Sequence, residues 1–186
     1  MTIKIPKFSV LIATLCMLFF YSCAEEVDFT KAEDLLLSPV LESSLVFFDE
    51  SANVFLDNGT EINVPSDFII VDFFDNQFIK DNLIKAEFIF ETLNTINRDF
   101  ELRIDFYNAA SELHHTFTVT EDASPTNSDV VTTYTEVFEG DVLEALKNTK
   151  VLNFTLTMLS GEAINENTLG QITLKSKAVF YFNIEG

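Results

Sequence analysis

Hydrophobic and polar residues alternate one by one through residues 84–94, 100–107 and 113–120. A period of two puts the apolar side chains on one face of an extended strand and the polar ones on the other. The pattern is typical of antiparallel strands that have one face in the core and one in water. Because the connections between these segments are short and polar, we predict a meander of three consecutive strands. The residues expected to face inward are Ile84, Ala86, Phe88, Phe90, Phe100, Leu102, Ile104, Phe106, Leu113, His115, Phe117 and Val119.

Shorter apolar segments predict further strands on both sides of this region. The expected strands are residues 45–49, 53–56, 68–74, 132–138, 152–159 and 171–184. Residues 68–74 (FIIVDFF) are apolar at nearly every position, which suits a strand buried on both faces or a helix equally well by periodicity, and the β-branched and aromatic content favours the strand. The last strand is long enough that we expect a bend or bulge near Ser176.

Turn and helix signals divide these strands. Asn58-Gly59 is a strong signal for a tight hairpin turn, with residues 62–64 as its returning arm. Residues 141–148 (DVLEALKN) predict the one short helix, with Asp141 as its N-cap and Glu144 completing a capping box. A helical turn at residues 32–37 would end before Pro39. Residues 121–129 are expected to form a mobile loop.

About eight strands, one short helix and no repeated strand–helix units predict an all-β fold. We expect an antiparallel β-sandwich, with a closed antiparallel β-barrel as the alternative. The expected organisation is a leader over residues 1–22, a tether over residues 23–43 and a single domain over residues 44–186.

The N-terminus has the features of an export signal. Lys4 and Lys7 precede a fourteen-residue apolar run, residues 8–21, which is shorter than the roughly twenty residues that span a bilayer. Cys23 follows directly after Ser22, so this segment resembles a bacterial lipoprotein signal. The residues just before the cysteine match the usual lipoprotein cleavage motif only loosely, and in this they are similar to Bacteroidetes lipoproteins. The resemblance implies cleavage before Cys23 and acylation of its thiol. Cleavage after Ala24 by the ordinary signal peptidase is the alternative.

Charge and composition narrow the possible partners. The net charge is −19, and loss of Lys4 and Lys7 with the leader makes it more negative. Such a surface repels phosphate backbones, so we expect no nucleic-acid binding. No intrachain disulfide is expected in a mature chain that retains only Cys23. Twenty Phe and no Trp suit a dry core and argue against an aromatic platform for sugars.

Candidate chemistry in the sequence is sparse, and we expect no enzymatic activity and no cofactor. His114 and His115 are adjacent on a strand and point to opposite faces, so they predict one surface and one core residue instead of a metal site. Asp57, Asn58 and Glu61 offer oxygen ligands for calcium, although a plain hairpin turn is favoured. Asp72 is expected at an edge that faces solvent.

Two functions remain open from the sequence. The favoured one is a non-catalytic, lipid-anchored structural or protein-interaction module of the cell envelope, most simply at the outer membrane, on its periplasmic or surface face. In this hypothesis a rigid sandwich presents loops, such as residues 121–129 and 160–170, to the partner. The alternative is a carrier of an apolar ligand in a Phe-lined cavity. A carrier requires a contiguous apolar pocket of several hundred cubic ångströms.

Overall fold

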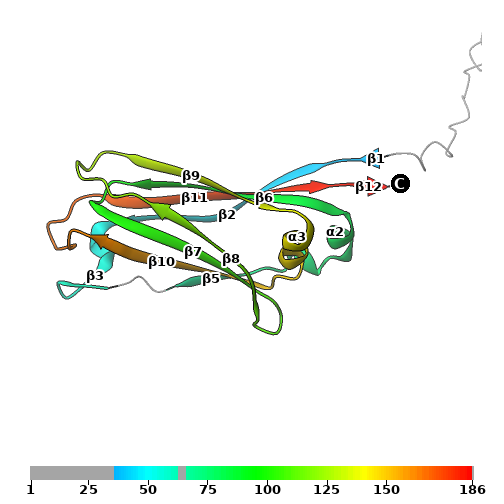
Figure 1. Cartoon of the computed structure of the whole chain (residues 1–186), viewed down its shortest axis with the longest axis horizontal. Helices are drawn as coiled ribbons and strands as arrows, with labels where there is room; N and C mark the ends of the chain where they lie inside the picture. Colours follow the sequence, from blue (N-terminus) through cyan, green and yellow to red (C-terminus); the bar gives the residue numbers. More distant parts are fainter. Residues whose placement is uncertain (1–35, 63–65, 186) are drawn as a thin grey trace, which may run out of the picture. The chain divides into compact units, whose positions relative to one another are not determined.

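The computed structural model describes residues 36–62 and 66–185. Most of these residues belong to two four-stranded antiparallel sheets that lie one over the other (Figure 1). The strand order is β2-β11-β6-β9 in the first sheet and β5-β10-β7-β8 in the second. The predicted β-sandwich is therefore confirmed, and the closed-barrel alternative is wrong because the strands form two separate sheets.

The bounds of the elements are as follows. The strands are β1 (Leu36–Leu37), β2 (Val40–Ser51), β3 (Leu56–Asp57), β4 (Thr60–Glu61), β5 (Asp67–Ile70), β6 (Leu83–Asn94), β7 (Arg98–Tyr107), β8 (Leu113–Glu121), β9 (Val130–Phe138), β10 (Val151–Gly161), β11 (Gln171–Phe182) and β12 (Ile184–Glu185). The helices are η2 (Ala52–Phe55), η3 (Phe73–Asp75), α2 (Gln77–Asn82) and α3 (Gly140–Lys147). Two short ribbons, β1-β12 and β3-β4, complete the strand pairing.

The predicted meander is wrong in one respect. β7 and β8 pair as a hairpin, but β6 pairs with β9 and β11 in the other sheet. The segment between β6 and β7 therefore carries the chain from one layer to the next. Alternation identifies which face of a strand is buried but does not identify its hydrogen-bonded neighbour. Here the apolar faces of β6 and β7 are opposed across the core.

Phenylalanine rings fill the space between the layers. The Phe88 ring lies 4.8 Å from Phe138 and 6.1 Å from Phe106, between ring centroids. Phe106 in turn contacts Phe117, at 5.8 Å. A second apolar cluster, at the end of the sandwich formed by η2 and β3, comprises Ala52, Phe55, Ile96, Phe100, Ile164 and Ile172.

Two members of the predicted inward set face outward. Ile84 is 54% exposed and Leu113 is 51% exposed. A register shift lies next to each of them, where β6 pairs with β11 and where β7 pairs with β8. Each irregularity shifts by one residue which positions of the strand face the core, so that Leu83 is buried in place of Ile84.

The predicted helix is present, with a different start. α3 closes one end of the sandwich, and its Leu143 and Leu146 are buried in the main core (Figure 1). The N-cap is Glu139, which makes no side-chain capping bond, so Asp141 lies in the first turn and the capping box with Glu144 is wrong. A carboxylate in the first turn still interacts favourably with the helix dipole.

Residues 53–56 do not form the predicted strand. Most of them belong to the 3-10 helix η2, which buries Ala52 and Phe55. The Phe55 ring packs 5.1 Å from Phe100. A helical turn lets the chain reverse over the end of the sheets while these two side chains point into the second cluster, which a short extended segment does not allow.

The stretch at residues 68–74 is only partly a strand. β5 is an edge strand of four residues, with Phe68 62% and Ile70 71% exposed, so the expectation of burial on both faces is wrong. The chain then leaves the sheet, and η3 places Phe74 in the core. The helix α2, which we had not predicted, follows. The Asn76 side chain caps it by accepting a hydrogen bond of 2.9 Å from the Phe78 amide.

The predicted hairpin turn and bulge are both confirmed, but the returning arm of the hairpin is Thr60–Glu61 instead of residues 62–64, of which 63 and 64 lie outside the described residues. Asn58 and Gly59 have φ values of +50° and +76° in the two-residue loop between β3 and β4. On β11, the register with β2 shifts between Lys175 and Lys177. At this position the Ser176 hydroxyl replaces the regular backbone pairing. It accepts a hydrogen bond from the Val46 amide and donates one to the Val46 carbonyl, both at 2.9 Å.

The described β structure begins before the predicted domain start at Ser44. Leu36 and Leu37 form β1, which pairs with β12, so the helical turn expected at residues 32–37 is wrong at these two positions. Residues 32–35 lie outside the described residues. Across residues 36–62 and 66–185, no helix has the length and hydrophobicity needed to span a membrane.

Candidate functional site

The two long sides of the sandwich differ in chemistry. Stacking the sheets places β8 beside β9 along one side and β2 beside β5 along the other. The β8/β9 side is closed by polar and aromatic contacts between the sheets. The β2/β5 side is open and apolar, and we call it the open seam.

Three side chains form the main polar contact on the closed side. His115 Nε2 on β8 lies 2.7 Å from Glu136 Oε1 on β9, and the Tyr134 hydroxyl donates to Glu136 Oε2 at 2.6 Å. The hydrogen bond to the Glu136 carboxylate raises the pKa of Tyr134 to about 12. The Tyr134 ring also stacks on Phe117, with 5.5 Å between centroids. This cluster joins the edges of the two sheets.

A buried carboxylate lies farther along the closed side. Glu121 is 2% exposed, and one of its oxygens accepts a hydrogen bond from Thr92 on β6. Its Oε1 has no hydrogen-bond partner among the described residues. Burial raises the pKa of Glu121, because an ionised carboxylate loses solvation there.

The open seam contains two adjoining apolar pockets. The first, of about 410 Å³, lies toward η2, and the second, of about 370 Å³, lies toward η3. Leu45 and Ile69 line both, so the pockets lie end to end. The first is lined by Leu45, Val46, Phe47, Phe48, Glu50, Phe55, Asp67, Ile69, Leu102, Phe154, Leu156 and Leu174. The second is lined by Leu41, Glu42, Ser43, Ser44, Leu45, Ile69, Ile70, Val71, Asp72, Phe73, Phe74, Phe88, Leu146, Thr149, Leu152 and Phe180.

Among the described residues, the exposure of β2 shows that the seam is incompletely covered. Leu41 is the register partner of Phe180, so both side chains lie on the inner face of the sheet. Phe180 is 6% exposed, whereas Leu41 is 49% exposed. Phe48, the partner of the fully buried Leu174, is only partly buried. Inner-face residues of β2 therefore have core neighbours on one side and solvent on the other.

Two carboxylates flank the first pocket from opposite sheets. Glu50 on β2 pairs with the buried Ile172, and Asp67 on β5 pairs with the buried Phe154. Each acid therefore shares the inner face of its sheet with a core residue, and both line the pocket. Neither pocket is lined by Lys or Arg, so the mouth of the first is negative.

The predicted lipidation site lies outside the described residues. This holds for Cys23 and for the whole expected leader and tether up to Leu35. The structure therefore describes the domain but not the proposed anchor.

The candidate calcium ligands are not brought together. Asp57 pairs with Thr60 while Glu61 pairs with Leu56, so the two acids point to opposite faces of the ribbon. Glu61 Oε1 accepts from the Ile164 amide at 2.5 Å, with Arg98 Nη1 3.5 Å away. The described chain also contains no cluster of three or more His, Cys, Asp or Glu suited to a metal.

The two histidines lie at a bulge in β8, because Phe106 pairs with His115 and Tyr107 with Leu113, so the predicted alternation of faces does not apply to His114. His115 packs against Phe106, Phe117 and Phe138 while bonding Glu136. His114 lies 3.4 Å from the Thr149 hydroxyl, and burial lowers its pKa. It is partly buried, so the expectation of a plain surface histidine is too simple.

Of two other expectations, the one for Asp72 is confirmed and the mobility of residues 121–129 stays a prediction. Asp72 is exposed beside β5, as predicted for an edge position. The loop at residues 121–129 is tied down by hydrogen bonds at several points. Ser124 is fully buried and its amide donates to the Ile96 carbonyl at 2.9 Å, while the Asn127 side chain donates to the Thr95 carbonyl at 2.7 Å.

Some polar positions were not anticipated. Glu121 continues the inward series of Phe117 and Val119 by one step, so extending the alternation would have identified it. Asp105 lies on the outer face of β7 and is 1% exposed, because Arg103 and Thr116 cover it with hydrogen bonds of 2.8 and 2.7 Å.

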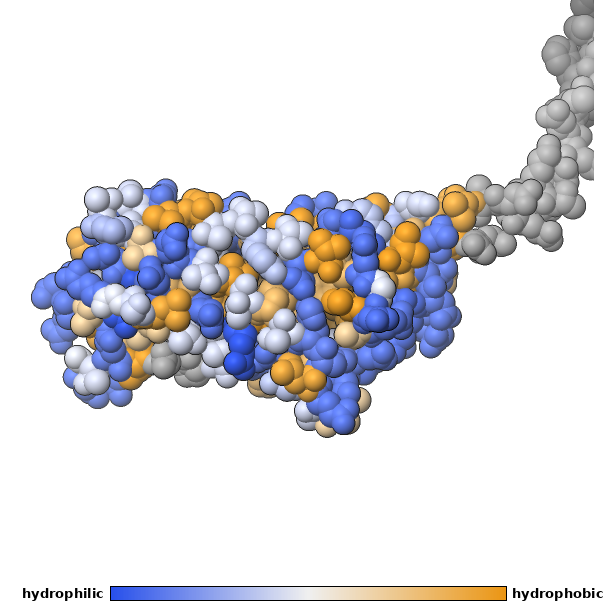
Figure 2. Space-filling model, viewed as in Figure 1, coloured by the Kyte–Doolittle hydropathy of each residue, from blue (hydrophilic) through white to orange (hydrophobic). Residues whose placement is uncertain are grey.

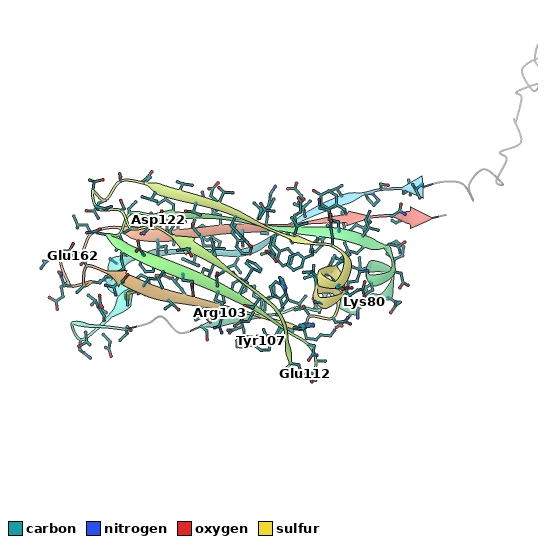
Figure 3. All side chains as sticks on the ribbon, in the orientation of Figure 1. Lys80, Arg103, Tyr107, Glu112, Asp122 and Glu162 are labelled. Carbon is teal, nitrogen blue, oxygen red and sulfur yellow. The ribbon has the colours of Figure 1, made fainter. Side chains whose placement is uncertain are left out.

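Charged residues are spread over the whole length of the sandwich. Arg103 lies on the second sheet, while Asp122 and Glu162 lie at the end of the sandwich opposite Lys80 (Figure 3).

The surface seen from the same direction has no single chemical character. Hydrophobic groups appear as separate spots among hydrophilic ones (Figure 2). The open seam differs from this surface because most of the residues that line its two pockets are apolar.

Comparison with known proteins establishes no family. No family model and no curated protein sequence matches the chain. Among solved structures, the infectious bursal disease virus VP2 subviral particle is similar at 12% identity over 77% of this chain and 32% of that chain, with a TM-score of 0.39. The Bacillus endospore appendage pili are similar at 9% identity over 78% of this chain and 90% of that chain, with a TM-score of 0.31. The chain spans about a third of the length of the viral proteins.

Proposed function

We propose that this chain is a non-catalytic, lipid-anchored module of the cell envelope that binds another envelope protein through the open seam. The observation that carries the proposal is the asymmetry of the sandwich. One side is closed by contacts such as His115–Glu136, whereas the other leaves Leu41 49% exposed and Ile69 only partly buried next to core residues. Apolar surface that adjoins a core is stabilised when a partner removes it from water.

The described polar clusters support a structural role over catalysis. His115 and Glu136 bond one another across the sheets, and Asp105 is held by Arg103 and Thr116. None of these clusters lies in the open seam, where the two pockets are mainly apolar. The seam therefore suits binding and not chemical transformation.

The anchor rests on Cys23 and its lipoprotein-like context. Residues 24–35 separate this cysteine from β1, and a fully extended segment of that length reaches about 40 Å. This reach is enough to bring a small domain to a partner near the membrane surface. We place the protein at the outer membrane, on its periplasmic or surface face.

Site-specific crosslinking tests the seam. A photo-crosslinking residue at Leu41 or Ile69, in intact host cells, should capture the same partner from both sides of the seam. The control positions are Val131 and Val137 of β9, which are 56% and 44% exposed. Capture of one protein from both seam positions and not from β9 supports the proposal. Equal capture from β9, or none from the seam, contradicts it.

Intact mass tests the anchor separately. The mature protein should begin at Cys23 and carry acyl chains, and Cys23→Ser should release it from the membrane fraction. An N-terminus at Glu25 without acyl chains contradicts lipidation and supports cleavage after Ala24.

A second candidate function, the carrier of an apolar ligand, is favoured by the size of the pockets. Volumes of about 410 and 370 Å³ are in the range of small-ligand sites. Native mass spectrometry of the purified protein distinguishes the two functions. A bound lipid of defined mass, lost on substituting Ile69 by Asp, supports the carrier, whereas a ligand-free mass supports the interaction module.

A further inference from the structure

The open seam combines an unpaired strand edge, an apolar floor and acidic groups at its mouth. From this combination we infer that it binds an extended peptide segment of the partner. In this segment apolar side chains alternate, and a lysine or arginine lies among the inward-facing residues. The inference rests on the proposed interaction function and specifies the kind of partner segment that the seam accepts.

The backbone of β2 provides the first part of the argument. β2 runs for twelve residues and pairs with β11 along one edge. Among the described residues, no strand pairs with its other edge. An unpaired edge presents free amide and carbonyl groups, and an added strand satisfies them.

The shape of the floor provides the second part. The two pockets follow the seam end to end and meet at Leu45 and Ile69. An extended peptide directs every second side chain to the same face, at a spacing of about 7 Å, so successive inward residues can reach successive parts of such a floor. At the deepest points the peptide side chains would meet Leu174 and Phe180, which are already core residues.

Charge selects among possible occupants. Glu50 and Asp67 approach the first pocket from opposite sheets, and the whole chain carries a net charge of −19. A fatty acid or an anionic phospholipid would place its own negative charge near these groups. A second copy of the chain would also be repelled. A cationic side chain on an otherwise apolar strand is attracted to the same position.

Synthetic peptides added to the full-length protein in detergent provide the test. The first probe is about ten residues long, alternates valine with threonine, and has lysine in place of the central valine. The second probe has glutamate at that position, and a third has the composition of the first with the alternation broken. Palmitate is the lipid probe. Fluorescence anisotropy measures the affinities, and hydrogen exchange measures the protection of the β2 amides.

Charge reversal at the seam makes the test specific. The lysine peptide should bind about fivefold more tightly than the glutamate peptide, and E50K combined with D67K should reverse this preference. The control variant combines D122K with D129K, two exposed acids near the closed side, and has the same net charge. It should retain the original preference. Thermal unfolding of both variants confirms that they remain folded.

The outcomes separate this inference from the interaction function. Reversal by the seam variant alone, with new protection of residues 40–51, supports the strand model. Equal binding of the alternating and broken peptides, or equal effects of the two variants, overturns it. Palmitate binding without peptide binding also overturns it and favours the carrier. If a partner crosslinks at Leu41 and Ile69 but none of the peptides competes, the interaction function stands and the strand model fails.

Discussion

His115 Nε2 on β8 lies 2.7 Å from Glu136 Oε1 on β9, and this contact joins the edge strands of the two sheets. It lies among Phe106, Phe117 and Phe138, so a polar contact closes a mostly aromatic side of the core. No comparable contact closes the opposite side, within the part of the chain that the structure describes. The position of the proposed binding surface follows from this difference.

Substitution of Glu136 should change the titration of Tyr134. The Glu136 carboxylate accepts a hydrogen bond from the protonated hydroxyl of Tyr134 and raises the pKa of Tyr134 to about 12. Glu136→Gln should therefore lower that pKa toward its ordinary value. The stabilisation from Tyr134 is fully present below about pH 10 and is lost as the pH rises toward the folded value. Tyrosinate absorbance measured during an alkaline titration reports this change. An unchanged titration curve in the variant would contradict the assignment.

Glu121→Gln should stabilise the protein at neutral pH. Burial raises the pKa of Glu121, so its contribution to stability is present at low pH and is lost as the pH rises through the folded pKa. Because glutamine is neutral at every pH, the variant should gain about 1 kcal/mol at pH 7. Urea unfolding at pH 4 and pH 7 measures the gain, which should disappear at the lower pH. Asp122→Asn, at an exposed neighbour, should show neither effect.

Ser176→Ala should destabilise the bulge in β11. The hydroxyl bonds both the amide and the carbonyl of Val46, and its removal leaves partly buried backbone groups unpaired. We expect a loss of about 1–2 kcal/mol in the free energy of unfolding. Ser43→Ala is the matched control on β2, because the Ser43 side chain is exposed and makes a single bond of 3.3 Å. Its substitution should cost about 0.5 kcal/mol or less. Equal losses in the two variants would show that the bulge does not depend on the hydroxyl.

Two glycines with positive φ should respond differently to alanine. Gly59 has φ +76° with nothing within 4 Å of an added Cβ, so Gly59→Ala should cost only the backbone strain, about 1 kcal/mol. At Gly170, φ is +107° and an added Cβ would lie 2.4 Å from the Thr95 carbonyl oxygen. Strain and overlap together should cost about 3 kcal/mol. Thermal unfolding of the pair measures the difference, and similar melting temperatures would contradict the packing at Gly170.

Predictions from short sequence motifs were reliable where residues close together in the chain decide the backbone conformation. Asn58-Gly59 adopts the left-handed conformations that its two-residue turn needs, and residues 140–147 form a helix with Leu143 and Leu146 buried. They were less reliable where burial overrides local preference. Phe55 and Phe74 enter the core from 3-10 turns, although their neighbourhoods are as apolar and β-branched as a strand.

The apolar cavity was predicted only as an alternative and without a location, and the interaction surface was expected at the loops of residues 121–129 and 160–170 instead of at the seam. The sequence indicated that a Phe-rich interior is either filled or hollow, and the structure shows an interior filled near Phe88 and Phe106 but open between β2 and β5. The acids at the seam, Glu50 and Asp67, had no signal of their own among thirty acidic residues. They became distinct only when the two edge strands were placed side by side.

The sequence by itself determined the all-β class, most strand positions, the hairpin turn, the bulge near Ser176 and the inward rows of Phe on β6 and β7. These features depend on neighbours within a few residues, where alternation and turn chemistry act directly. Only the tertiary structure decided that β6 and β7 belong to different sheets, that β8 and β9 close one side, and that β2 and β5 leave the other open. Those outcomes depend on strand pairing between residues far apart in the chain, and an alternating pattern fits many pairings equally well.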